Sequence, residues 1–404
     1  MAGKNILVMH GGGPTAVINA SLYGIVAEGK LHGEIAHIYG AHGGPSGLVN
    51  GTLIDLGAMP DSELVRLRDA PGSAIGTGRD ALAGHYPAMV ELLIKNGIDI
   101  VMPTGGNGTM NTCALLQEAI DEAGADIQVI GVPKTMDNDI AVTDHCPGFG
   151  SAAKYIATSC AEVYKDAHVY DTGMVCIIEI MGRHAGWLTA SAALAGLAGC
   201  APDLIYLPET DFDMEKFVES VERVYREKGN CIVAVSEGVH YADGSFVSEA
   251  KTSATDGFGH AQLGGLASLL AQVVKEKTGA KVRGIELSLL QRCGAHLASE
   301  TDIEEAVMSG KAAVENAVNG ITDKMVGFER SYEDGQYVCK TKLLPLTDVA
   351  NTEKKVPIEW INAAHNGVEK PFIDYVLPLI QGEPKLPKED SLPRFAKLKK
   401  VLVK

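Results

Sequence analysis

Two carboxylates lie two residues apart in the segment Pro133-Lys134-Thr135-Met136-Asp137-Asn138-Asp139, directly after an apolar run. One carboxylate of such a pair can take the proton of an attacking hydroxyl while the other holds Mg2+ or its water. Clustering these charges with a lysine and a threonine is energetically costly, which favours a functional role. A turn with side-chain-to-backbone hydrogen bonds explains the same residues equally well, so the segment alone leaves both interpretations open.

Two glycine clusters, Gly11-Gly12-Gly13 and Gly105-Gly106-Asn107-Gly108-Thr109, also follow apolar runs and precede helical patterns. Glycines let a phosphate approach the backbone, and the N-terminus of the next helix supplies N–H donors and a partial positive charge. One such cluster is equally well a tight turn, but two at strand ends favour a polyphosphate site. Neither has the spacing of a P-loop or of a dinucleotide-binding loop.

Arginines provide further candidates for binding anions. Arg183 follows a strand in the glycine-flanked turn Met181-Gly182-Arg183, a position suited to clamping a phosphoryl group. Arg79 lies in the glycine-rich stretch 76–80, although a surface salt bridge is the simpler interpretation there.

Three more residues complete the set of candidates. Arg283 and Arg292 flank a strand-like run and are candidates for a second anionic group, and Glu237 follows an apolar strand, where it could accept sugar hydroxyls.

The elements that must position these residues form an alternating pattern. Apolar runs ending in glycine or polar residues predict strands at 6–9, 98–102, 127–132, 174–180 and 231–235. Helical periodicity predicts helices at 15–24 (with Pro14 in the first turn), 113–120, 188–201, 214–228, 261–278 and 303–318. Apolar strands separated by helices indicate a parallel sheet covered on both faces, and such sheets bind ligands at the carboxyl ends of their strands.

The composition narrows the function further. The chain has 404 residues, 46% of them hydrophobic, and a net charge of −16, which argues against nucleic acid or an anionic membrane as the main partner. Its eight cysteines form no CxxC pair, which favours a reduced intracellular protein and disfavours a zinc site. The N-terminal apolar run is too short for a signal peptide, and no apolar stretch reaches the ~18 residues of a spanning helix. We therefore expect a soluble, cytoplasmic protein.

Taken together, the motifs resemble those of the A-type 6-phosphofructokinases. GGGPTAVINAS, GTGRD, PTGGNGT, PKTMDNDI, PGFGSAAKYIA, EIMGRHAGW, VSEG and RGIELSLLQR occur in that family's order over about residues 5 to 320. The C-terminal TDVANTEKKVPIEWI and PFIDYVLPLIQGE also look like the extension of the pyrophosphate-using branch. The resemblance implies transfer of a phosphoryl group to fructose 6-phosphate, giving fructose 1,6-bisphosphate in glycolysis, with Mg2+ as cofactor.

The resemblance also implies a role for each candidate residue. Asp137 would deprotonate the sugar 1-hydroxyl, Thr135 and Asp139 would hold substrate and metal, and Arg183 would stabilise the transferring phosphoryl group. The sugar-phosphate site would comprise Thr135, Asp137, Met181, Gly182, Arg183, Glu237, Arg283 and Arg292. The donor site would comprise Gly12, Arg79, Gly105, Gly106, Asn107, Gly108, Thr109 and Lys134.

Three positions depart from the family's pattern. Asn107 replaces the usual metal-binding Asp, so Mg2+ would rely on Asp139, with Asn107, and on the donor phosphates. Met174 replaces a common Arg, and Leu289 replaces a common His, both of which normally help to grip the 6-phosphate. The last two departures concern the sugar phosphate that the enzyme accepts and not the type of reaction.

The phosphoryl donor depends on two positions with opposite implications. Pyrophosphate-using relatives typically have an Asp where this chain has Gly108, which leaves room for a nucleotide, whereas Lys134 suits pyrophosphate. Members that combine this Gly and Lys tend to use ATP, so the sequence favours ATP slightly, with pyrophosphate as the alternative. A non-catalytic regulatory subunit that binds fructose phosphates is an alternative of another class, but Asp137, Asp139 and Arg183 argue against it.

The resemblance implies two Rossmann-like α/β domains with the active site in the cleft between them, plus a C-terminal extension. We expect a phosphoryl-donor domain at 1–141 with 255–320, a sugar-phosphate domain at 142–254, and the extension at 321–404. Arg283 would be borrowed across a subunit interface, so we expect a homodimer or homotetramer.

Overall fold

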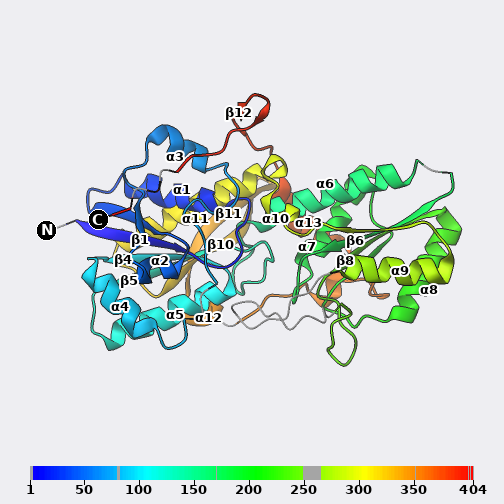
Figure 1. The fold of residues 1–404 in the computed structure, drawn as a ribbon, viewed down its shortest axis with the longest axis horizontal. Helices are drawn as coiled ribbons and strands as arrows, with labels where there is room; N and C mark the ends of the chain where they lie inside the picture. The colour runs from blue at the N-terminus through cyan, green and yellow to red at the C-terminus, as the bar shows by residue number, and fades with distance from the viewer. Residues whose placement is uncertain are drawn as a thin grey trace. The chain divides into compact units, whose positions relative to one another are not determined.

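The computed structural model describes residues 3–79, 82–169, 171–248, 265–350, 352–398, 400 and 402–403. The chain divides into two compact units. Unit 1 comprises residues 1–151, 292–354 and 382–404, and unit 2 comprises residues 152–291 and 355–381. Both are α/β units built on parallel strands, as expected (Figure 1).

Unit 1 contains a seven-stranded sheet in the order β11-β10-β5-β4-β1-β2-β3. Its strands are β1 (Lys4–His10), β2 (Ile35–Ala41), β3 (Leu53–Asp55), β4 (Ile100–Gly105), β5 (Gln128–Pro133), β10 (Lys324–Glu333) and β11 (Gln336–Pro345). The pairs from β2 through β1, β4 and β5 to β10 are parallel, whereas β3 and β11 pair antiparallel at the two edges.

Helices cover both faces of this sheet, as its nearly continuous apolar strands predict. Leu7 and Met9 of β1 lie in one core with residues of α4 (Tyr86–Lys95), α5 (Asn107–Glu122) and α12 (Leu346–Val349). Ile6 and Val8 lie in a second core with α1 (Ile18–Gly29), α3 (Asp61–Leu67) and α11 (Glu300–Val318). The remaining short elements of unit 1 are α2 (Pro45–Val49), η2 (Ala295–Leu297), β12 (Lys388–Glu389) and β13 (Leu392–Pro393).

Unit 2 contains a four-stranded parallel sheet in the order β7-β8-β6-β9. These strands are β6 (Met174–Ile180), β7 (Leu204–Tyr206), β8 (Asn230–Ser236) and β9 (Val282–Glu286). One core joins them to α8 (Met214–Lys228) and α9 (Leu266–Thr278), while α6 (Phe149–Ala167) lies on the opposite side of the sheet (Figure 1). The short elements are α7 (Trp187–Ala190), η1 (Ser191–Ala198), η3 (Ile358–Trp360), α13 (Lys370–Val376) and η4 (Leu377–Ile380), while α10 (Leu290–Cys293) begins in unit 2 and ends in unit 1.

The division differs from the expected boundaries 1–141 with 255–320, 142–254 and 321–404. The strand β9 pairs with β6, which places residues 265–291 in unit 2. The expected extension is not a separate body, because β10 and β11 extend the unit 1 sheet beyond β5, which would otherwise be an edge strand. Residues 355–381 join unit 2, where Trp360 and Phe372 pack against Trp187.

Two helices also differ from their predicted forms. The first begins at Ile18 and not near Thr15, because the chain bends at Gly12, whose N–H donates to the carbonyl of Gly78, and turns again at residues 16–17. The run 188–201 forms the short helix α7 followed by the 3-10 helix η1. For the expected helix at 261–278, residues 261–264 lie outside the described part of the chain, and α9 covers the rest.

Candidate functional site

The glycine clusters and the carboxylate segment follow three adjacent parallel strands of unit 1. β1 pairs with β4 as far as His10 and Thr104, and β4 pairs with β5 as far as Gly105 and Pro133. Their loops therefore leave the sheet at one edge. The strand order reverses between β1 and β4, which is where ligands bind in open parallel sheets.

The first two of these loops pack so closely that they require glycine. A Cβ on Gly105 would lie 2.1 Å from Oγ1 of Thr109, and one on Gly11 would lie 2.3 Å from the same atom. Gly12 adopts a φ of 75°, in the left-handed region that favours glycine. The two loops are thus lined by backbone, and Thr109 packs against both of them.

Three cations converge on the Gly11–Gly13 loop. Nζ of Lys134 donates hydrogen bonds to the carbonyls of Gly11 and Gly13. A Cβ on Gly13 would lie 2.6 Å from Nη1 of Arg292 and 3.6 Å from Nη2 of Arg79. Such a concentration of positive charge is stabilised when an anion binds beside it.

The pKa values reflect this concentration. Burial, together with the positive charges of Arg292 and Arg79, lowers the pKa of Lys134 to about 8, although the carboxylate of Asp137 opposes the fall. Burial also lowers the pKa of Arg292, and Arg79 adds to that effect. Arg292 belongs to unit 1 and lies beside the Gly11–Gly13 loop, whereas Arg283 and Glu237 belong to unit 2.

The N-terminus of α5 contributes backbone donors to the same edge. Gly106 directly precedes the helix. Among the described residues, no side chain caps the first turn, and that turn contains no Asp or Glu. Asn107 and Gly108 are the first two helical residues, so their N–H groups have no partner within the helix, whereas the N–H of Thr109 donates to the carbonyl of Gly106. The N–H groups of Asn107 and Gly108 suit an anion that approaches the glycine loops.

The side chains of Asn107 and Asp139 are joined by a hydrogen bond. Nδ2 of Asn107 donates to Oδ2 of Asp139 over 2.8 Å. The other side-chain oxygens, Oδ1 of Asn107 and Oδ1 of Asp139, are buried and have no hydrogen-bond partner among the described residues. Burial raises the pKa of Asp139, and the nearby Glu353 raises it further. Two unpaired buried oxygens fit a hard divalent cation, which binds oxygen and typically takes further ligands from substrate phosphates.

Asp137 acts electrostatically on the same cations at the Gly11–Gly13 loop. Its charge raises the pKa of Lys134 and that of Arg292, so its carboxylate is close to both. Its backbone N–H donates to Oγ1 of Thr135 over 3.1 Å, which fixes the turn. The segment is thus a hydrogen-bonded turn and also a cluster of charges, so the two interpretations of it are compatible.

Unit 2 brings a second group of candidates to the carboxyl ends of β6 and β8. Oε1 of Glu237 accepts the N–H of Gly182 over 3.3 Å, and burial raises the pKa of Glu237 while Arg183 opposes the rise. A Cβ on Gly238 would lie 1.9 Å from the carbonyl of Arg183, so this crossing requires glycine. Met181, Gly182, Arg183 and Glu237 therefore form one compact group.

Arg283 does not belong to that group. It lies in β9 opposite Cys176, three residues before the end of the strand. Its side chain lines a cavity of about 470 Å³ together with Met174, Lys281 and two carboxylates of α6, Glu162 and Asp166. Lys281 supplies a second cation beside Met174, the position at which the sequence lacks an arginine.

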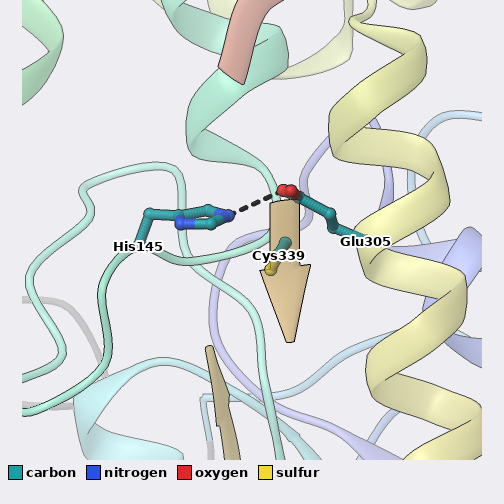
Figure 2. A group of neighbouring side chains, drawn as sticks. All are labelled: His145, Glu305 and Cys339. Carbon is teal, nitrogen blue, oxygen red and sulfur yellow. Dashed lines mark hydrogen bonds and ion pairs between the residues drawn. The ribbon is translucent and has the colours of Figure 1, made fainter. Parts of the chain in front are cut away.

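A buried cluster in unit 1 has the residue types of a metal site but is hydrogen-bonded within the protein. Figure 2 shows His145, Glu305 and Cys339 pointing toward one another. Nε2 of His145 lies 2.6 Å from Glu305, and its Nδ1 lies 2.8 Å from Asp144. The hydroxyl of Tyr337 donates to the second oxygen of Glu305. Both ring nitrogens and both carboxylate oxygens thus have partners, which indicates an ion-pair network.

Two residues near the candidate site have no recognisable sequence signal. Glu209 accepts the N–H groups of Gly186 and Val356 and so links the turn after Arg183 to residues 355–381 of unit 2. Lys354 donates to the segment that follows Asp137. Neither residue lies in a periodic pattern or a glycine cluster, and the role of each depends on contacts that are distant in the sequence.

Among the described residues, no helix has both the length and the apolar character needed to cross a bilayer.

The parallel α/β fold, with its cationic glycine loops and adjacent carboxylates, defines an enzyme of the phosphotransferase class. The family model described as phosphofructokinase matches residues 5–317. The chain belongs to the phosphofructokinase family, as its motifs predict.

Individual relatives agree with this assignment. The pyrophosphate–fructose 6-phosphate 1-phosphotransferase of Halomonas elongata is 39% identical over 99% of this chain and 97% of its own length. The ATP-dependent 6-phosphofructokinase of Mycobacterium bovis is 30% identical over 87% of this chain and 95% of its own. The solved structure of the pyrophosphate-dependent phosphofructokinase from Marinobacter aquaeolei matches with a TM-score of 0.89 and 38% identity, over 99% of this chain and 97% of that one.

Proposed function

We propose that this enzyme transfers a phosphoryl group from pyrophosphate to the 1-hydroxyl of fructose 6-phosphate. The products are fructose 1,6-bisphosphate and phosphate, so the reaction would contribute to glycolysis. The observation that supports the proposal is that the segment with Asp137 follows β5 at the sheet edge where both glycine loops leave, with Nζ of Lys134 bonded to the carbonyls of Gly11 and Gly13. A base for the acceptor hydroxyl would then lie next to cations for the transferred phosphate.

The donor is the point on which this proposal departs from the sequence-based preference. Gly108 favoured ATP, but the relative that matches over almost the whole chain is named for pyrophosphate, and the ATP-dependent relative is less similar. The cationic cluster around Gly11–Gly13 supports the same choice, because it can neutralise a compact polyphosphate without any contact to a nucleoside.

In the proposed mechanism, Asp137 takes the proton of the sugar 1-hydroxyl, and the hydroxyl oxygen attacks the nearer phosphorus of pyrophosphate. The bridging P–O bond breaks and phosphate leaves. Lys134, Arg79 and the N–H groups of Asn107 and Gly108 hold the donor. Gly12, Gly105 and Gly106 allow its close approach, and Thr109 supports the loop through its packing against Gly11 and Gly105. Arg183 stabilises the transferred group, and Met181, Gly182, Glu237, Thr135, Arg283 and Arg292 bind the sugar phosphate.

Mg2+ is the divalent ion we propose for the pair of oxygens on Asn107 and Asp139. When bound, it would neutralise charge on the donor phosphates. The eight free cysteines support a reducing, cytoplasmic location for the enzyme.

The proposal is tested by incubating the purified protein with fructose 6-phosphate, pyrophosphate and Mg2+, and by measuring both products. Equal amounts of fructose 1,6-bisphosphate and phosphate are expected, and the reverse reaction should run from those two products. A protein that binds fructose 6-phosphate but forms no product with either pyrophosphate or ATP would contradict the proposal and support the regulatory-subunit alternative.

We expect Asn107→Asp to tighten metal binding. The new carboxylate would stand within hydrogen-bonding distance of Asp139, replacing an amide–carboxylate contact by two like charges that a cation can bridge. The Mg2+ concentration for half-maximal activity should fall about 3- to 10-fold. Without Mg2+, the variant should unfold at a lower temperature than the native protein. An unchanged Mg2+ requirement would remove Asn107 from the metal site.

We also expect the enzyme to be a homodimer or homotetramer that shares Arg283 between subunits. Arg283 lies in a surface cavity apart from Met181 and Glu237, which supports the sharing. Arg283→Ala should raise KM for fructose 6-phosphate at least ~10-fold, as expected for the loss of a charge-assisted hydrogen bond. Co-expression of Arg283→Ala with the inactive Asp137→Ser should restore part of the activity in mixed oligomers. An active monomer in sedimentation analysis would contradict this prediction.

A further inference from the structure

Glu353 and Lys354 lie beside the segment that contains Asp137 and Asp139, which comes more than 200 residues earlier in the chain. Glu353 pairs with Ile140 as an isolated antiparallel bridge, and the N–H of Lys354 donates to the carbonyl of Asp139 over 2.7 Å. These backbone contacts place the Lys354 side chain against the turn that follows the two carboxylates.

The ammonium group of Lys354 contacts three oxygens of that turn. Nζ lies 2.7 Å from the carbonyl of Asp144, 3.2 Å from that of Thr143 and 3.5 Å from Oδ1 of Asn138. A lysine ammonium has three N–H groups, so its hydrogen-bonding capacity matches these three acceptors. The arrangement leaves Lys354 occupied within the protein and not directed at a substrate.

Asn138 connects this contact to the reacting carboxylates, because it lies between Asp137 and Asp139. It is fully buried, and its φ of 54° is in the left-handed region, which is uncommon for a residue other than glycine. Its Oδ1 also accepts the N–H of Cys146 over 3.0 Å. The conformation of Asn138 sets the directions of both neighbouring carboxylates, and Lys354 and Cys146 hold it in place.

A second layer fixes the oxygens to which Lys354 binds. Asp144 pairs with Arg330, and its backbone N–H donates to the carbonyl of Phe328. The adjacent His145 is held by Glu305 as Figure 2 shows. The backbone at Thr143 and Asp144 is therefore held by contacts within unit 1. Lys354 connects it to Asn138 through the hydrogen bonds of its ammonium group.

We propose that Lys354 is a positioning residue for the reaction: it holds Asn138, and through Asn138 it sets Asp137 and Asp139 in their reactive directions. This inference rests on the proposed role of Asp137, although the contact between Lys354 and the turn does not. Small displacements of reacting groups reduce turnover strongly while leaving substrate binding largely intact, so the effect should appear in kcat.

The test compares Lys354→Met with Lys388→Met, which removes an exposed lysine of β12 in the same unit. For Lys354→Met, kcat per folded molecule should fall at least about 30-fold, while KM for fructose 6-phosphate and for the donor changes less than about 3-fold. Lys388→Met should match the native enzyme. Lys354→Gln, which keeps two of the donor N–H groups on a shorter chain, should fall between Lys354→Met and the native protein.

Hydrogen exchange provides a readout that does not require activity. In Lys354→Met, amides of residues 137–146 should exchange at least about 10-fold faster than in the native protein, with the β-strands of unit 1 unchanged. Should Lys354→Met fail to fold, the same two measurements on Lys354→Gln decide the matter.

A kcat within 3-fold of the native value, or unchanged exchange at 137–146, would overturn the proposal. A rise in KM without a fall in kcat would also overturn it, because Lys354 would then act as a binding residue. Failure of the proposed function would instead appear as an inactive native enzyme, with the exchange result still able to show whether Lys354 holds the turn.

Discussion

Asp137→Ser is expected to lower kcat by about 10²- to 10⁴-fold, the usual contribution of a general base. Serine cannot take the hydroxyl proton at neutral pH, whereas the backbone hydrogen bond from residue 137 to Thr135 does not depend on the side chain. The fold and the binding of fructose 6-phosphate should therefore be nearly intact. The measurement is kcat together with the dissociation constant of fructose 6-phosphate from calorimetry.

The same substitution has a second, electrostatic effect. Asp137 raises the pKa of Lys134, which burial and two arginines lower to about 8. Without that carboxylate the pKa of Lys134 should fall further, so the variant should lose donor affinity at a lower pH than the native enzyme does. Activity within a few-fold of native would rule out Asp137 as the base, and an equal loss of sugar-phosphate affinity would point to a purely structural turn.

The strands and most of the candidate site could be predicted because their signals are local. The apolar runs predicted β6 to the residue, and the amphipathic pattern predicted α8 equally well. The glycine clusters were predicted at strand ends, and close packing against Thr109 explains why glycine is required at Gly11 and Gly105.

The division into units could not be predicted, because it depends on contacts between distant segments. Nothing in the sequence of β10 specifies that it pairs with β5, and nothing in residues 355–381 specifies that they pack on Trp187. The contacts of Lys354 could not be predicted for the same reason, because its three acceptors lie over 200 residues away in the sequence. Arg283 and Arg292 flank one strand-like run in the sequence, yet the boundary between the units falls just before Arg292.

The native enzyme is expected to use pyrophosphate with a kcat/KM at least about 100-fold above that for ATP. Pyrophosphate is compact and highly charged, and Lys134 and Arg79, the two cations proposed to hold the donor, lie at one short loop. A charge-assisted hydrogen bond contributes about 1.5–3 kcal/mol, or roughly 10- to 150-fold in affinity. Lys134→Met removes such a bond and also the two contacts that shape the Gly11–Gly13 loop, so kcat/KM for pyrophosphate should fall about 10²- to 10³-fold. Lys388→Met serves as the control for loss of an exposed lysine.

The pH dependence and position 108 separate this explanation from its alternatives. Because the pKa of Lys134 is lowered to about 8, its positive charge is present below that pH and lost above it, so kcat/KM for pyrophosphate should decline above pH 8.

Gly108→Asp would add a carboxylate at the exposed start of α5, where the α-phosphate of ATP would approach. Pyrophosphate has no such phosphate, so its turnover should stay within a few-fold while any residual use of ATP disappears. A native preference for ATP that Gly108→Asp abolishes would reverse the donor assignment, because the open position at Gly108 would then outweigh the cationic loop.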